Sequence, residues 1–277
     1  MMVTSLIAAA VLAMTPATDR TLVAAGDIAC RGDQREQASE CRQARTAAVA
    51  RAQRPAAVAL LGDTQYDRGT AAEFRGGFDR SWGRLPGLRP APGNHEYSTP
   101  GAAGYYAYFG ARAGPGRRGY YSYDLGAWHI VSLNSNCESV SCAAGSAQER
   151  WLRADLARNR ARCTLAYWHH PRFSSGLHGS DRRTAPLVAA LVRDRADVVL
   201  TGHDHSYERF AVRDGIRHFV AGGGGRSLYG FPRRASGSQR RLARFGVLAL
   251  TLRPTGYAWR FLSDRGATLD RGVSDCV

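Results

Sequence analysis

The stretch from Val198 to His205, VVLTGHDH, places an apolar run directly before two histidines that are separated by one residue. The apolar run predicts a strand, and a strand directs alternate side chains to the same face. His203 and His205 can therefore point together into one cleft, and imidazole is a common metal ligand. The stretch predicts metal binding at the end of a strand, with the two histidines serving either one metal or two.

Polar side chains follow four more apolar runs in the same manner. The runs are Thr21–Ala25, Ala56–Leu61, Leu88–Ala91 and Thr164–Trp168, and the side chains that follow are Asp27, Asp63 with Tyr66, Asn94 with His95, and His169 with His170. In α/β sheets, ligands bind beyond the carboxyl ends of the strands. A single site built from all five strand ends is the simplest interpretation. His129 and His218 lie inside expected strands, so we expect structural roles for them.

The rest of the chain alternates expected helices and strands. We expect helices at Arg35–Gln53, Ala71–Trp82, Ser146–Arg160 and Thr184–Arg195, a hairpin of Tyr120–Asp124 with Trp128–Leu133, and late strands at Tyr207–Val212, Arg217–Val220, Val247–Leu252 and Tyr257–Leu262. The polar segment Phe231–Arg244 is expected to be a surface loop, with polyanion binding as an alternative role. The pattern predicts an α/β core with antiparallel strands added late, in one domain over residues 19–277.

The charge of the chain is strongly positive. The sequence has 38 basic and 23 acidic residues, and every basic residue is arginine. A positive field can steer anionic substrates. However, the arginines are spread along the whole chain, which favours an arginine-rich genome composition as the cause.

The N-terminus and the cysteines both point to export. Residues 1–18 contain a short apolar stretch typical of a signal peptide, although no basic residue precedes Arg20, and a frayed apolar terminus is the alternative. The six cysteines suit disulfides in an oxidising compartment. We expect the pairs Cys30–Cys41, Cys137–Cys142 and Cys163–Cys276, although six cysteines allow about 15 connectivities. The predicted location is secreted or extracytoplasmic, without stable membrane insertion.

The five motifs together resemble the calcineurin-like metallophosphoesterase superfamily and, within it, the purple acid phosphatases. The resemblance rests on Gly26-Asp27, Gly62-Asp63-Thr64-Gln65-Tyr66, Gly93-Asn94-His95-Glu96, His169-His170-Pro171 and Gly202-His203-Asp204-His205. Many relatives have a histidine ligand two positions after the first aspartate, where this chain has Ala29. Purple acid phosphatases instead have a tyrosine three residues after the second aspartate, which Tyr66 matches, although they usually have glycine at the position of Ala29.

This resemblance implies a fold and a metal centre. The implied fold is an α/β, four-layer β-sandwich of two mixed sheets flanked by helices. The implied cofactors are two metal ions, Fe(III) with Fe(II), Zn or Mn. By resemblance, one metal would bind Asp27, Asp63, Tyr66 and His205, and the other would bind Asp63, Asn94, His169 and His203. Asp63 would bridge the two.

The resemblance also implies catalytic roles and an activity. His95 would lie beside the leaving oxygen, His178 would face the substrate, and His170 is expected to support the ligands. The implied activity is a secreted acid phosphatase that hydrolyses small phosphate monoesters through a metal-bound hydroxide. A phosphodiesterase or nuclease on the same metals is the alternative, with nucleic acid only as a substrate. Specificity is expected in loops such as Gly101–Gly119 and Phe231–Arg244. A metal-binding protein without catalysis is a second alternative.

Two other enzyme classes are disfavoured. The glycine-rich run Gly222–Gly225 is not followed by the Gly-Lys-Ser/Thr of a P-loop, and we expect it to turn the chain close to the site. The sequence also lacks the Gly-x-Ser-x-Gly elbow of serine hydrolases.

Overall fold

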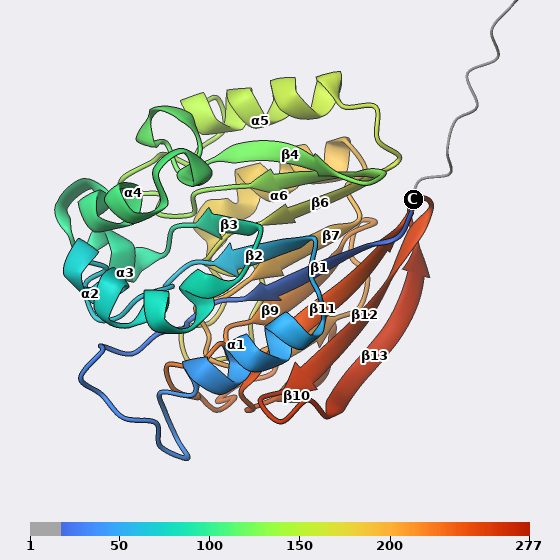
Figure 1. Cartoon of the computed structure of the whole chain (residues 1–277). Helices are drawn as coiled ribbons and strands as arrows, with labels where there is room; N and C mark the ends of the chain where they lie inside the picture. Colours follow the sequence, from blue (N-terminus) through green and yellow to red (C-terminus); the bar gives the residue numbers. More distant parts are fainter. Residues whose placement is uncertain (1–17) are drawn as a thin grey trace, which may run out of the picture.

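Two mixed β-sheets face each other between two layers of helices in the computed structural model, which describes residues 18–277 (Figure 1). The predicted signal peptide, residues 1–18, lies outside the described residues apart from its last position. The first sheet has the spatial order β13 (Thr268–Asp275), β12 (Gly256–Ser263), β11 (Gly246–Arg253), β1 (Arg20–Ala25), β2 (Ala57–Leu61) and β3 (Leu88–Ala91). The second has the order β10 (Ser238–Leu242), β8 (Tyr207–Phe210), β9 (Arg217–Ala221), β7 (Val198–Thr201), β6 (Cys163–Tyr167), β5 (Trp128–Ser132) and β4 (Tyr121–Leu125).

The helices are divided between the two outer faces. The first sheet is covered by α1 (Gln43–Ala52), α2 (Ala71–Gly76) and α4 (Ala103–Phe109), and the short α3 (Asn94–Tyr97) packs beside α4. The second sheet is covered by α5 (Ala147–Arg158) and α6 (Ala185–Arg193). No helix within residues 18–277 combines the length and the apolar composition that crossing a membrane requires. The two sheets and the helices on their outer faces form four layers, which confirms the fold class predicted from the sequence.

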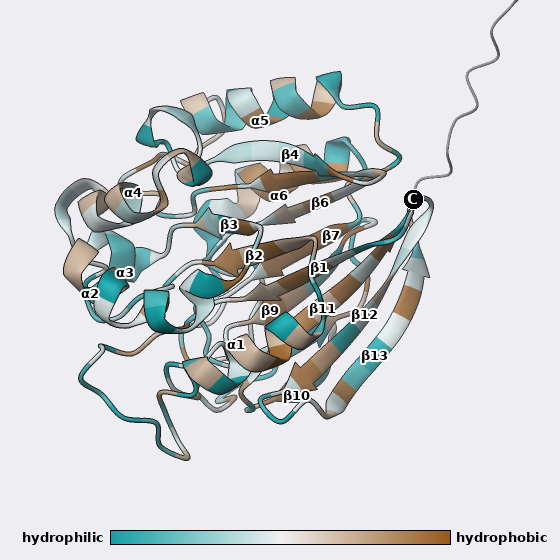
Figure 2. Cartoon of the chain, in the orientation of Figure 1, coloured by the Kyte–Doolittle hydropathy of each residue, from teal (hydrophilic) through white to brown (hydrophobic). Residues whose placement is uncertain are grey.

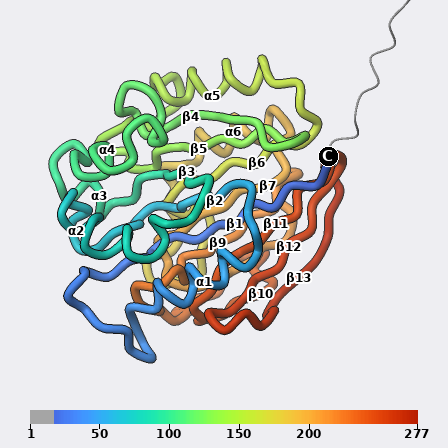
Figure 3. The backbone as a smooth tube through the Cα atoms, viewed as in Figure 1, coloured from blue at the N-terminus to red at the C-terminus, as the bar shows by residue number. Residues whose placement is uncertain are grey.

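Each sheet joins a group of parallel strands to antiparallel ones. β1, β2 and β3 run parallel to one another, as do β5, β6, β7 and β9, whereas β11 and β4 join antiparallel. Strands that are covered on both faces read as continuous apolar runs, and β2 (AVALL) is buried at every position. The exposed edge strand β13 (TLDRGVSD) is instead mostly polar, with Leu269 and Val273 as its apolar side chains (Figure 2). Figure 3 shows β1 beside β11, although more than 200 residues separate them.

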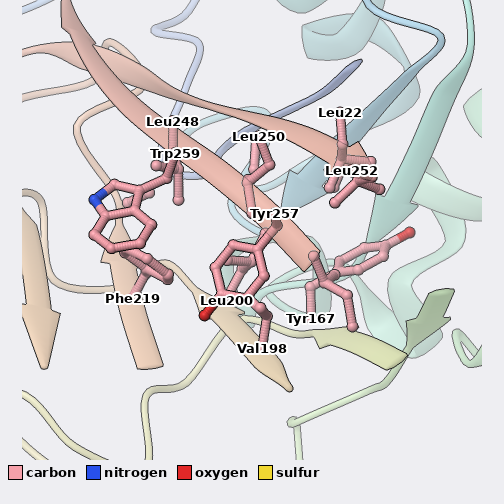
Figure 4. Packing of buried hydrophobic residues seen from close by; sticks show 14 of the residues in the cluster. Leu22, Tyr167, Val198, Leu200, Phe219, Leu248, Leu250, Leu252, Tyr257 and Trp259 are labelled. Atoms are coloured by element: carbon pink, nitrogen blue, oxygen red, sulfur yellow. The ribbon is translucent and has the colours of Figure 1, made fainter. Parts of the chain in front are cut away.

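A hydrophobic core fills the space between the sheets. Leu22 of β1 and Leu250 of β11 meet Leu200 of β7 and Phe219 of β9 there, and all four side chains are fully buried (Figure 4). Burying apolar surface at about 25 cal/mol per Å² is the main force that holds two such sheets together. The core fixes the strands, and through them the loops at the carboxyl ends of the strands.

Four expectations from the sequence are corrected by the structure. The expected helix Arg35–Gln53 begins only at Gln43, because residues before it form a loop in which Cys41 and Arg42 donate to the carbonyls of Arg226 and Gly225. The expected helix Ala71–Trp82 ends at Gly76 and continues as two 3₁₀ turns, because the pair Gly76-Gly77 weakens a helix.

Two segments that were expected to be loops contain regular secondary structure. The expected surface loop Phe231–Arg244 contains β10, whose polar residues pair with β8 at the edge of the second sheet. The expected loop Gly101–Gly119 contains α4, whose Tyr105 and Phe109 are buried against α2. β13 was not anticipated, because a mostly polar sequence gives little indication of a strand.

All three predicted disulfides are confirmed. Cys30–Cys41, Cys137–Cys142 and Cys163–Cys276 are bonded and close 11, 5 and 113 residues of chain. The third bond ties β6 in the second sheet to the end of the chain beyond β13 in the first. Together the bonds fit folding in an oxidising compartment.

Removing the Cys163–Cys276 bond is expected to lower the free energy of unfolding by about 4 kcal/mol, because the bond restricts a long loop in the unfolded chain. The variant is Cys163→Ala/Cys276→Ala, measured by urea unfolding. Cys137→Ala/Cys142→Ala is the matched control, and its short loop predicts a loss of about 2 kcal/mol. Equal losses in the two variants would contradict the loop-length explanation.

Candidate metal centre

Five strand ends bring the candidate ligands together. Four of them lie two residues beyond the end of a strand: Asp27 after β1, Asp63 after β2, His169 after β6 and His203 after β7. The fifth, Asn94, lies three residues beyond the end of β3. The carboxyl ends of these parallel strands meet at one edge of the sandwich. The site is thus built by the topology of both sheets, as the sequence predicted.

The first group of side chains converges on the phenol of Tyr66. Its hydroxyl lies 3.0 Å from Asp27 Oδ1, 3.1 Å from Asp63 Oδ2 and 3.0 Å from His205 Nε2. His205 Nε2 is also 3.3 Å from Asp27 Oδ1. These four side chains are the ones that the resemblance assigns to one metal.

The second group converges on His169. Its Nε2 lies 3.3 Å from Asp63 Oδ2, 3.0 Å from Asn94 Oδ1 and 3.1 Å from His203 Nδ1. Asp63 Oδ2 therefore belongs to both groups. This shared oxygen is the position expected of a bridging ligand.

The chemistry of the donors fits two cations. The carboxylates of Asp27 and Asp63 are 0% and 2% exposed, and within residues 18–277 neither forms an ion pair with an arginine. The phenol of Tyr66 has one proton, which can satisfy only one of three neighbouring acceptors. Buried carboxylates need a counter-charge, and a set of oxygen and imidazole donors is one that divalent and trivalent metals accept.

Outer hydrogen bonds aim two of the histidines inward. His169 Nδ1 lies 2.8 Å from the carbonyl oxygen of Leu61, and His205 Nδ1 lies 2.8 Å from Ser227 Oγ. The carbonyl can only accept, so Nδ1 of His169 carries a proton and Nε2 is the nitrogen that faces the site. Such outer partners orient metal-binding histidines.

Burial and mutual charge shift the pKa values of these groups. Burial opposes ionisation of Asp63, but the charge and hydrogen bond of His169 outweigh it and lower the pKa of Asp63. Burial also opposes protonation of His169, yet Asp63 raises the pKa of His169 to about 9. Burial, followed by the charges of Asp27 and Asp63, raises the pKa of Tyr66 well above 10.0. Without a metal, the phenol is therefore neutral, Asp63 is ionised and His169 carries a positive charge beside it.

Glycines beside the ligands leave no room for side chains. A Cβ at Gly93 would lie 2.2 Å from Asp63 Oδ1, and one at Gly62 would lie 2.6 Å from Nδ1 of His169. Gly62 also has φ +81°, a conformation that other residues rarely adopt. The lack of space for a Cβ thus explains why glycine precedes the candidate ligand in the Gly-Asp and Gly-Asn motifs. A Cβ at Gly222 would come as close to the side chain of Asp27 as one at Gly62 would to His169. The glycine-rich run therefore turns the chain beside the site.

Glu96 organises the loop that carries Asp63, a role that the sequence did not reveal. Its fully buried carboxylate accepts hydrogen bonds from the amides of Asp63, Thr64, Gln65 and Gly93 at 2.7–3.3 Å, and from Thr64 Oγ1 at 2.8 Å. Its position in the Gly-Asn-His-Glu motif was the only signal in the sequence. Glu96 joins the loops after β2 and β3 into one unit.

Asp204 plays the same part for the loop that carries His178. This buried residue, between His203 and His205, accepts from the amide of His178 at 2.8 Å, from the amide of Gly179 at 3.3 Å, and from Ser174 Oγ. The ring of His178 is then stacked on His203, with centroids 4.2 Å apart. The sequence showed Asp204 only as the residue between two ligands.

The other histidines take up distinct positions. His95 packs on Tyr66, its Nδ1 lies 2.5 Å from the carbonyl oxygen of Asp67, and its Nε2 lies 3.9 Å from Asp63 Oδ2. His170 is buried, with Nδ1 2.8 Å from Ser135 Oγ and its ring 4.6 Å from that of His203.

The two histidines expected to be structural lie away from these groups. His129 is hydrogen-bonded to Asp124 and Asp155, and His218 packs against Phe173. Neither is among the side chains that surround Asp63 Oδ2.

Comparison with known proteins links this chain to one family. The family model for the calcineurin-like phosphoesterases matches residues 19–207. Purple acid phosphatase 22 of Arabidopsis thaliana is 35% identical over 102 residues, which cover 33% of this chain and 22% of the relative. Purple acid phosphatase 18 of the same plant is 30% identical over 142 residues, which cover 45% of this chain and 32% of the relative.

A solved structure supports the fold over a longer stretch. The purple acid phosphatase from yellow lupin (Lupinus luteus) seeds superposes with a TM-score of 0.78 at 18% identity, covering 94% of this chain and 54% of the lupin protein. The matches thus span less than a third of each curated relative and about half of the lupin chain.

Proposed function

Because the chain belongs to the calcineurin-like phosphoesterase family, we propose that it is a metal-dependent hydrolase of phosphate monoesters. The observation that carries the proposal is the position of Asp63 Oδ2, which lies within 3.3 Å of both Tyr66 and His169. One oxygen shared by two groups of donors suits a pair of cations, which in two-metal hydrolases lie about 3.5–4 Å apart.

We propose the following division of ligands. Asp27, Asp63, Tyr66 and His205 would hold one metal, and Asp63, Asn94, His169 and His203 would hold the other. Bound cations would supply Lewis-acid stabilisation of phosphate oxygens and would lower the pKa of water.

The surrounding histidines suit proton transfer and substrate contact. The half-exposed ring of His95 has Nδ1 engaged by the carbonyl of Asp67, and its Nε2 faces the site. We propose that His95 protonates the leaving oxygen, a contribution of about 10²–10⁴-fold. His178, exposed above His203, would contact the substrate.

The proposal is tested by assaying metal-loaded protein on p-nitrophenyl phosphate, on its bis-ester and on single-stranded DNA. Monoester hydrolysis that is lost with a chelator and restored by added metal is the expected result. Strong turnover of the diester with negligible turnover of the monoester would favour the phosphodiesterase alternative instead.

Tyr66 provides a test of metal identity. We propose a ferric ion at the Tyr66 group with Fe(II), Zn or Mn at the other, because a phenolate suits a hard cation. A visible absorption band is expected in the purified protein and is expected to disappear in Tyr66→Phe. Elemental analysis runs beside the spectrum, and Tyr97→Phe is the matched control. A colourless protein containing two zinc ions would remove the iron assignment while leaving the hydrolase proposal intact.

We also propose that the protein is secreted and that residues 19–277 form one domain. The three disulfides support an extracytoplasmic location. The pairing of β11 with β1 supports one domain, because the end of the chain completes the sheet that its beginning starts.

A further inference from the structure

A polar cavity of about 360 Å³ lies directly beside the candidate metal centre. Its inner end is formed by Asn94 and His170, and its walls come from Tyr97 and Ser98, from the turn Asn136–Ser139, and from Arg183. Asn94 Oδ1 lies 3.0 Å from His169 Nε2, so the cavity begins at the candidate ligands. Its volume is in the range of small-molecule sites.

The walls of this cavity are held by hydrogen bonds. Asn134 Oδ1 accepts from the amide and the side chain of Asn136 at 3.1 and 3.0 Å, while Asn134 Nδ2 donates to Tyr97 Oη at 2.8 Å. The Cys137–Cys142 disulfide closes the same turn. A preformed wall loses little conformational entropy when a ligand binds.

The cavity has no unpaired cation to offer a ligand. Within residues 18–277, Arg183 is the only arginine that lines the cavity, and it makes hydrogen bonds of 2.7–3.1 Å to both oxygens of Asp181. Its remaining nitrogen bonds Glu138 at 3.0 Å, and the side chain of Glu138 is 88% exposed at the mouth. Asp181 does not line the cavity, but it neutralises Arg183 and so leaves the charge of Glu138 in excess at the mouth, although the chain as a whole carries +15.

The remaining lining is uncharged and rich in hydrogen-bonding groups. Asn136 offers an amide, Ser98 and Ser139 offer hydroxyls, and Tyr97 offers a phenol. Such groups match the hydroxyls of an alcohol, whereas the excess negative charge repels a second phosphate or a carboxylate.

We propose that this cavity binds the leaving alcohol of the substrate and selects uncharged, hydroxyl-rich alcohols such as polyols and sugars. Glu138, held by Arg183, excludes alcohols that carry a further anionic group. This inference rests on the proposed phosphomonoesterase activity and adds the substrate class to it.

The test compares two substrates of similar size, glycerol 1-phosphate and 3-phosphoglycerate, which differ by a carboxylate in place of a hydroxymethyl group. The metal-loaded protein is expected to prefer glycerol 1-phosphate by at least about tenfold in kcat/KM. In Glu138→Lys, the ratio of kcat/KM for 3-phosphoglycerate to kcat/KM for glycerol 1-phosphate is expected to rise by about five- to tenfold.

Asp19→Lys is the matched control, because it makes the same change of charge at an exposed residue next to the start of β1, at the opposite end of the strand from the site. This variant is expected to leave the substrate ratio unchanged. A ratio near one in the unmodified protein, or equal responses to Glu138→Lys and Asp19→Lys, would overturn the inference. Absence of p-nitrophenyl phosphate hydrolysis in all three proteins would instead contradict the proposed function itself.

Discussion

Asp63→Asn is expected to lower the rate of phosphomonoester hydrolysis by at least about a thousandfold, because preorganised charge at a metal centre supplies much of the stabilisation of the transition state. The carboxylate oxygen Oδ2 is the atom that both groups of donors approach, at 3.1 Å from Tyr66 and 3.3 Å from His169. Asparagine has nearly the same shape but removes the negative charge. We therefore expect the purified variant to contain less than one metal ion per chain by elemental analysis.

The fold should survive this change, which makes the experiment specific. The other oxygen of Asp63 accepts a hydrogen bond from the amide of His95 at 2.9 Å, and an asparagine oxygen can keep that bond. Asp19→Asn, at a residue whose side chain is 56% exposed, is the matched control and is expected to retain full activity and metal content. Unchanged hydrolysis by metal-free protein would show that the assigned chemistry is wrong.

Glu96→Gln is expected to lower the free energy of unfolding by about 3 kcal/mol or more, because it leaves buried donors without acceptors. The carboxylate accepts from four backbone amides and from the hydroxyl of Thr64. A glutamine keeps one accepting oxygen and turns N–H groups toward the other donors. Urea unfolding of the metal-free protein measures the loss.

Metal affinity supplies a second measurement for Glu96. Because this side chain joins the loops of Asp63 and Asn94, its loss is expected to weaken metal binding about 10–100-fold, as for other residues that position ligands. Glu149→Gln is the matched control, since Glu149 is also buried but accepts from the amide of Gly145 in the first turn of α5, away from the site. A loss of stability in Glu149→Gln as large as that in Glu96→Gln would contradict a special role for Glu96.

Local sequence patterns predicted most of the strands and all of the candidate ligands. The reason is physical: an apolar run buried on both faces must be a central strand, and a polar residue just beyond it lies at the edge where such strands end together. His203 and Asp27 could be placed in this way without knowledge of the partner strands. The pairing of Cys163 with Cys276 was also correct, although the two residues are 113 positions apart.

Patterns failed where long-range contacts outweighed local preference. Arg35–Cys41 is rich in residues that favour helices, yet a disulfide and hydrogen bonds to the loop at Gly225 and Arg226 hold it as a loop. β10 and β13 have polar sequences and are strands because β8 and β12 supply hydrogen-bonding partners. Partners of this kind are decided by topology.

The sequence by itself therefore determined the family, the order of the strands that carry ligands, and the identity of the donors at their ends. Only the tertiary structure decided which oxygen of Asp63 the two groups share, that Glu96 and Asp204 hold the loops of the candidate ligands, and that Glu138 meets Arg183 at the mouth of a cavity. The physical reason is the distance along the sequence between the groups that interact. The burial of a strand follows from its own side chains, whereas a shared oxygen, a buried acceptor and an ion pair exist only when segments distant in sequence are packed together.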